Sequence, residues 1–189
     1  MKYSLIAALL LPVLVSATEA TPKLREQKIA LSENREVLIA VPDGFALVTG
    51  QDDNGLPVVK LSGPKESVTI DLHFLPDPEG KYATPRARME LMHEMFVEFV
   101  DSSTEKGMQF EELGPKTGAG TYCVFTDKKL VGKTELPPGE YVHLTNGIKA
   151  WPGVIAVFRC FSNDTTSAGY KAIITMLRES VHERPIPLK

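Results

Sequence analysis

The segment from Val68 to Phe74 alternates strictly between apolar and polar side chains, and this pattern constrains the fold more than any other feature of the sequence. Successive side chains of a β-strand point to opposite faces of its sheet, so the segment predicts a strand with one buried face. Its apolar residues are Val68, Ile70, Leu72 and Phe74, and its polar residues are Thr69, Asp71 and His73. A strand of this kind requires neighbouring strands and a layer that covers its apolar face.

Two Asn-Gly pairs predict hairpins between further strands. Asn-Gly favours the type I′ turn that joins antiparallel strands. Asn54-Gly55 separates the strand candidates Phe45–Thr49 and Pro57–Ser62, and Asn146-Gly147 separates Gly139–Thr145 and Ile148–Trp151. The other strand candidates are Lys28–Leu31, Glu36–Val41, Thr121–Thr126 and Val154–Phe161, and the polar segment Lys128–Pro138 is predicted to be a protruding loop.

Two segments have the spacing of amphipathic helices. Thr84-Pro85 has the residue types of an N-cap and a first helical position, and the apolar stripe that follows reaches about Ser102. Asp164 or Thr165 is the expected cap of a second helix near the C-terminus. Hairpins imply antiparallel pairing, so the fold class is α+β: an antiparallel twisted sheet with two main helices packed on it.

The N-terminus has the layout of an export signal. Lys2 precedes the apolar run Leu5–Val15, and small residues follow at Ser16 and Ala17. We therefore expect a signal peptide over residues 1–17, with alternative cleavage after residue 20, and a periplasmic or secreted, soluble protein with no membrane anchor after cleavage. We expect a flexible leader over residues 18–27, a single domain over residues 28–184 and a tail over residues 185–189.

Cys123 and Cys160 are the only cysteines of the chain. An even number of cysteines in an exported protein suggests a disulfide. Both lie in predicted strands, so we expect a Cys123–Cys160 bond if those strands are neighbours.

The composition and motifs exclude several function classes. A net charge of -3 argues against a nucleic-acid partner. The sequence contains no G-x-S-x-G, P-loop or G-x-G-x-x-G motif, so we assign no catalytic, cofactor-binding or metal-binding residue. One alternative is a metal-assisted hydrolase in which His73 and His143 meet across the sheet beside Asp71.

A segment near the C-terminal half concentrates residue types that are common in interfaces. Tyr141, His143, Lys149 and the single tryptophan, Trp151, lie within eleven positions, and large aromatic residues are enriched at binding hot spots. We identify these four residues as candidate partner-binding residues. A second alternative is a lipid or small-ligand carrier, with the Met-rich helix after Thr84 as a pocket wall.

The turn Val41-Pro42-Asp43-Gly44-Phe45 resembles the VP-x-G-aromatic turn of PsbP-like and DcrB-like proteins. The order of strands, helix, strands and terminal helix over residues 28–182 is also similar. The resemblance implies an α/β/α sandwich around an antiparallel sheet. Members of this family are mostly binding, assembly-accessory or chaperone modules, and many bacterial members are exported.

These features together predict an exported binding or accessory protein that acts through contact with another protein. A specific form of this hypothesis is an immunity or inhibitor protein that neutralises a toxin or hydrolase in the bacterial envelope.

Overall fold

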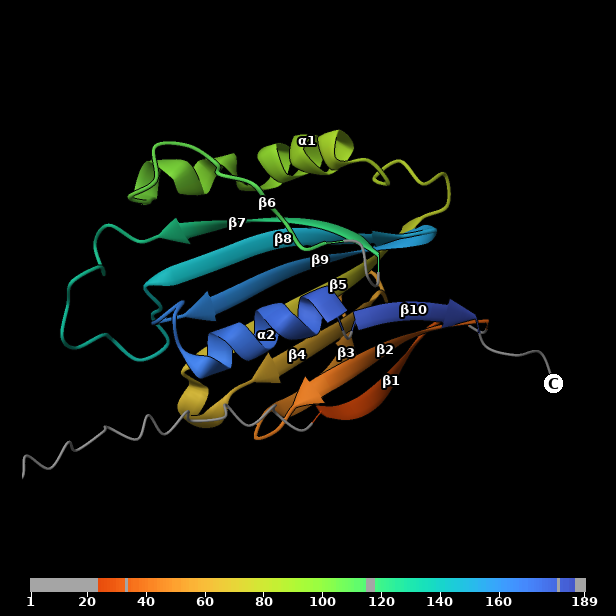
Figure 1. The fold of residues 1–189 in the computed structure, drawn as a ribbon, viewed down its shortest axis with the longest axis horizontal. Coiled ribbons are helices and arrows are strands. Elements are labelled where there is room, and N and C mark those ends of the chain that lie inside the picture. Colours follow the sequence, from red (N-terminus) through yellow and green to blue (C-terminus); the bar gives the residue numbers. More distant parts are fainter. Residues whose placement is uncertain (1–23, 33, 115–117, 180, 186–189) are drawn as a thin grey trace, which may run out of the picture.

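The computed structural model describes residues 24–32, 34–114, 118–179 and 181–185 (Figure 1). Within these ranges it contains ten strands, two α-helices and two short 3₁₀ segments. The strands are β1 Leu24–Ser32, β2 Arg35–Pro42, β3 Ala46–Gln51, β4 Pro57–Ser62, β5 Val68–Asp77, β6 Glu111–Glu112, β7 Ala119–Thr126, β8 His143–Trp151, β9 Gly153–Ser162 and β10 Val181–Pro185. The helical elements are η1 Pro64–Glu66, α1 Pro85–Phe96, η2 Val97–Ser102 and α2 Ala168–Glu179.

The strands form two antiparallel sheets. The larger sheet has seven strands in the order β3-β4-β5-β9-β8-β7-β6, and the smaller one has the order β1-β2-β10. The predicted alternating strand becomes β5, which lies inside the large sheet between β4 and β9. The predicted fold class, an antiparallel sheet with two packed helices, is therefore confirmed.

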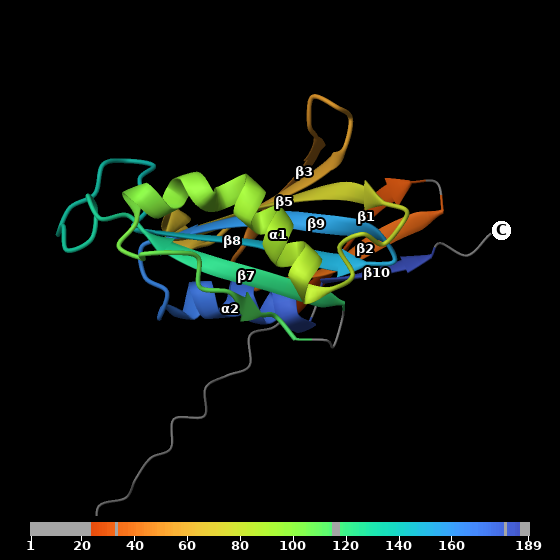
Figure 2. The ribbon, with the colours of Figure 1, turned by 90° about the horizontal axis from the view of Figure 1, so that it is seen from above.

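The two helices cover opposite faces of the large sheet (Figure 2). Under α1, Met92 and Phe96 pack with buried residues of β7, β8 and β9. On the other face, Ile173 and Leu177 of α2 pack with β5, β9 and the small sheet in the main hydrophobic core. The apolar face predicted for β5 points into this main core. The layers are therefore α1, the large sheet, and then α2 together with the small sheet.

The helix caps agree with the prediction at α1 and differ at α2. The Thr84 hydroxyl accepts a hydrogen bond from the Ala87 amide at 3.2 Å, and Pro85 is the first helical residue. At α2, the Ser167 hydroxyl accepts the Tyr170 amide at 3.2 Å, so Ser167 is the cap. Asp164 instead forms the turn before the helix, where its carboxylate accepts the Thr166 amide at 2.7 Å.

The predicted hairpin at Asn146-Gly147 is wrong. Both residues lie inside β8, which runs without interruption from His143 to Trp151. The chain reverses instead between β8 and β9, where Gly153 adopts a φ of 83°. The hairpin at Asn54-Gly55 is confirmed, since it joins β3 to β4 and Gly55 has a φ of 76°.

The structure also lengthens the first predicted strand and adds one strand after the second helix. β1 begins at Leu24, so part of the expected leader is a strand, and β10 follows α2 as a strand that the sequence pattern did not reveal. The expected signal peptide, residues 1–17, lies outside the described residues. Among the helices of the described ranges, none is long and apolar enough to cross a membrane. The polar segment after β7 forms the expected loop between β7 and β8 (Figure 1).

Candidate binding site

The predicted disulfide is wrong, because the two cysteines are free and point to opposite faces of the large sheet. Cys123 lies on β7 in the cluster beneath α1, and Cys160 lies on β9 in the main core under α2. β8 separates their strands. Burial raises the pKa of each thiol to about 12, so both are protonated and unreactive at neutral pH.

The four candidate partner-binding residues do not share one surface. Lys149 and Trp151 are buried on the α2 side of β8. His143 lies at the other end of the same strand, where it is half-buried and its Nδ1 lies 3.1 Å from the Thr126 hydroxyl. Tyr141 precedes β8, and its ring contacts the ring of Phe161 at 5.7 Å between centroids. In this structure Lys149 and Trp151 are core residues.

Lys149 has an unusual environment for a charged side chain. Its Nζ donates a hydrogen bond to the Leu177 carbonyl in the last turn of α2, and it lies 5.6 Å from the ring centre of Trp151. A cation at a helix C-terminus is favoured by the helix dipole. Burial nevertheless lowers the pKa of this amine to about 7.

Replacing Lys149 with methionine is expected to change how stability depends on pH. The unfolded chain keeps its lysine protonated up to about pH 10.4, whereas the folded protein releases the proton near pH 7. Between these two pKa values the unfolded chain binds one proton more than the folded protein, so the free energy of unfolding rises with pH by up to about 1.4 kcal/mol per pH unit. This contribution is complete above the unfolded pKa and is lost as pH falls toward 7. Urea unfolding at several pH values from 6 to 10 measures it. Wild type should gain stability relative to the Lys149→Met variant as pH rises, and parallel curves would contradict this.

The histidines of the alternative metal site are far apart along the sheet. His73 of β5 is opposite Val157 of β9, whereas His143 of β8 is opposite Ser162 at the end of β9. No group of three potential metal-binding side chains occurs among the described residues. The hypothesis that His73, Asp71 and His143 form one metal site is therefore wrong.

The Met-rich helix packs as core. Met92 is fully buried and Met95 is half-buried, and both belong to the cluster between α1 and the sheet. The two cavities described below lie elsewhere in the fold.

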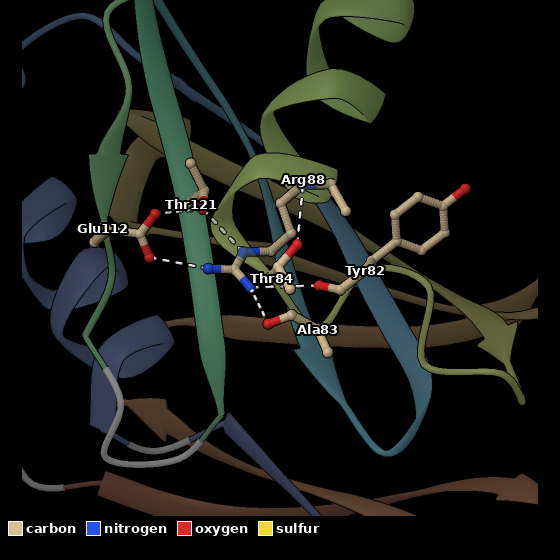
Figure 3. Close-up of polar contacts among 7 residues, drawn as sticks. Tyr82, Ala83, Thr84, Arg88, Glu112 and Thr121 are labelled. Carbon is tan, nitrogen blue, oxygen red and sulfur yellow. Dashed lines mark hydrogen bonds and ion pairs between the residues drawn. The ribbon is translucent and has the colours of Figure 1, made fainter.

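A buried arginine fixes the start of α1 to the edge of the large sheet (Figure 3). Arg88 is almost completely buried, and its Nε donates to the Thr121 hydroxyl at 2.9 Å. Its two terminal nitrogens bind the Glu112 carboxylate at 3.1 Å and the Ala83 carbonyl at 2.9 Å. The Thr121 hydroxyl also donates to Glu112 at 2.7 Å. These contacts join α1, β6 and β7, and they make Arg88 a structural residue.

Asn146 is the second polar residue beneath α1, and neither atom of its amide has a hydrogen-bond partner. It is fully buried between Cys123 and Arg159 in the register of the sheet. A buried amide without partners destabilises a fold, because on folding the amide loses its hydrogen bonds to water and forms none within the protein.

Replacing Asn146 with leucine is therefore expected to stabilise the protein by about 1–2 kcal/mol. The matched control is Thr145→Val on the same strand, where the hydroxyl makes a 2.8 Å hydrogen bond to Tyr170. The control should lose about 1 kcal/mol. Urea midpoints compare the two, and a loss of stability in Asn146→Leu would show that water or a ligand satisfies this amide.

β3 is an open edge of the large sheet. It is six residues long with the sequence ALVTGQ, contains neither charge nor proline, and Val48 at its centre is 64% exposed. The opposite edge, β6, is only two residues long, and both are glutamates. Charged, short edge strands prevent pairing with other chains. β6 is thus protected against such pairing, whereas β3 is not.

A groove of about 450 Å³ lies beside this edge. It separates β3 from β1, which is itself the edge strand of the small sheet. The residues around it are Gln27, Lys28, Ile29, Ala30, Thr49, Gly50, Gln51 and Pro57. A smaller hollow of about 170 Å³ lies near the start of β2 and the β8–β9 turn, lined mainly by apolar side chains. The groove is the larger of the two and is flanked by two strand edges, so we consider it the candidate binding site.

The register of β3 with β4 determines which backbone groups of β3 point away from the sheet, at the edge beside the groove. Antiparallel residue pairs alternate between those that exchange hydrogen bonds and those that do not. The Asp52 amide donates to the Leu56 carbonyl at the end of the hairpin, so Gly50 and Val48, two and four residues earlier, direct their backbone groups toward β4. The residues whose backbone groups point outward are Leu47, Thr49 and Gln51.

The same reasoning applies to β1. Pro42 has no N–H, so its pair with Leu24 cannot exchange two hydrogen bonds, and the next pair, Arg25 with Val41, does so. The outward backbone groups of β1 are therefore those of Glu26, Lys28 and Ala30. The outward backbone groups of the two edge strands flank the groove, one row from each sheet. In the β1 row the Lys28 carbonyl accepts a hydrogen bond from the Gln27 side-chain amide at 3.5 Å.

Sequence reasoning did not identify this groove. The available signal was the uncharged segment Ala46–Gln51 between two turns, because edge strands of stable proteins usually carry a charge or a proline. The sequence did not reveal, however, that β3 lies at an edge or that β1 lies across from it.

Comparison of this chain with known protein families, with curated proteins and with solved structures found no match. The site is therefore defined by its own geometry.

Proposed function

We propose that this protein is an exported binding or accessory protein that acts through protein–protein contact, and that the β3 edge with its adjacent groove is the docking surface. The observation that carries the proposal is the contrast between the two edges of the large sheet. The edge strand β3 is six residues long and has no charged residue, whereas the edge strand β6 consists of two glutamates. Natural sheets protect such edges unless something pairs with them.

Two further features support a binding role. The ionisable groups that are most strongly buried, such as Arg88 and Lys149, contact structural partners on neighbouring elements. The groove itself is lined mostly by uncharged polar and small residues, which suit recognition of a peptide backbone. An immunity or inhibitor protein in the bacterial envelope is the form of this function that fits the export signal expected at residues 1–17. The resemblance to PsbP-like and DcrB-like accessory proteins points to the same class.

Selection of a displayed random-peptide library on the purified protein tests the proposal. Peptides should be enriched, and a Thr49→Trp variant should weaken their binding at least tenfold. Thr49 is exposed and lines the groove. It lies on the same face of the sheet as its partner Val59, which packs in the main core together with Ile29 of β1, so a tryptophan at this position occupies the groove.

The matched control is Gly107→Trp, because a Cβ atom at Gly107 would meet no atom within 4 Å and this residue is not among those that line the groove. Binding in the control should equal that of the wild type. Failure to enrich any peptide, or equal binding by both tryptophan variants, would contradict the proposed function.

A further inference from the structure

The backbone geometry of the groove specifies how a partner would bind. This inference rests on the proposed function and deepens it. β3 presents outward peptide groups at Leu47, Thr49 and Gln51, with the spacing of two residues that a paired strand requires. Across the groove, β1 presents a second row with the same spacing. Such rows form hydrogen bonds with an extended peptide and not with a helix, whose own peptide groups are already paired.

We propose that the partner contributes an extended, proline-free segment with an acidic residue, which enters the groove and adds to β3 as a further strand. Hydrogen bonds from the outward groups of Thr49 and Gln51 would hold its backbone.

The chemistry of the lining residues supports the choice of an acidic segment. Among the described residues around the groove, Lys28 carries the only charge, and it is exposed. A carboxylate on the added strand would pair with this ammonium group, whereas a basic segment would be repelled. Ile29 and Pro57 supply the apolar part of the lining, which suits the alternation of apolar and polar side chains along a bound strand.

Proline substitution separates strand addition from other ways of filling the groove. Thr49→Pro removes an N–H that points outward, and edge strands tolerate proline at such positions. Peptides selected on the wild type should bind this variant at least tenfold more weakly. The matched control, Thr134→Pro, lies in the exposed β7–β8 loop and should bind them as the wild type does.

Amide hydrogen exchange on the wild-type protein gives a second measurement that does not depend on how the variant folds. Saturating peptide should slow exchange at Thr49 and Gln51 at least tenfold, while Val48 and Gly50, already paired with β4, should change little. Exchange unchanged at Thr49 and Gln51 would overturn strand addition. If Thr49→Trp still abolished binding in that case, the proposed function would stand and only this mode would fail.

The charge of the partner is tested by Lys28→Glu. Acidic peptides should lose at least fivefold in affinity for this variant, and the loss should shrink at high salt because screening weakens exposed charge pairs. Enrichment of basic peptides on the wild type would overturn this part of the proposal. A second copy of the chain is the alternative occupant. It would be identified, and the proposal overturned, if the amides of Thr49 and Gln51 were protected from exchange without peptide and the protein formed a dimer that Thr49→Pro dissociates.

Discussion

Replacing Gly147 with alanine is expected to destabilise the protein by about 3 kcal/mol, although alanine normally stabilises a strand relative to glycine. A Cβ atom at Gly147 would lie 2.1 Å from the ring of Phe158. Phe158 is fully buried in the main core under α2, so its ring cannot move aside without displacing its neighbours. Chemical denaturation measures the loss.

Two companion variants show whether this clash is the cause. Gly50→Ala places the same methyl group on β3, where nothing lies within 4 Å, and should change stability by less than about 0.5 kcal/mol. Adding Phe158→Leu to Gly147→Ala should recover part of the loss, because the contact would no longer exist in the double variant. Strictly additive effects of the two substitutions would contradict the account.

Replacing Arg88 with methionine is expected to lower stability by about 3 kcal/mol. Methionine keeps much of the aliphatic volume but removes the hydrogen bonds to Thr121, Glu112 and the Ala83 carbonyl. Buried polar groups that lose their partner keep the full free-energy penalty of dehydration. Because half of the Glu112 side chain is exposed, water can solvate part of its carboxylate, which places the effect at the lower end of the range for a broken buried ion pair.

Arg86→Met on the same helix is the matched control. Arg86 forms an ion pair with Glu90 at 2.8 Å, but both side chains are largely exposed, and exposed pairs of this spacing contribute about 0.3–0.5 kcal/mol. Thermal unfolding of the two variants should therefore differ clearly. Similar melting temperatures would show that the Arg88 contacts do not fix α1 to the sheet.

The elements with strong local signals were predictable from the sequence. β5 combined strict alternation with turns on both sides, and α1 began with a threonine cap followed by proline. In both cases the side-chain pattern and the local backbone preference agree, so no distant contact was needed to decide the structure.

The Asn146-Gly147 pair shows where local signals fail. Its turn preference is overridden because the strand continues to pack against both layers, and the glycine is required by the approach of Phe158 from β9. A glycine inside a strand can mark such a close approach instead of a turn. The sequence alone does not contain the position of Phe158, so the two explanations could not be separated.

The site depended even more on tertiary structure. A disulfide between Cys123 and Cys160 required the two residues to lie on neighbouring strands and on one face, and neither condition is met. Lys149 and Trp151 were candidate partner-binding residues, but both are buried, because α2 covers that part of β8. The groove between β1 and β3 depends on how two separate sheets lie against each other, which no local pattern encodes.

The structure of the protein with a peptide selected on it tests the central claim most directly. The account predicts an extended peptide in the groove between β1 and β3, with its backbone hydrogen-bonded to Thr49 and Gln51. A peptide bound elsewhere, for example on the exposed sheet face around Lys60 and Arg159, would contradict it.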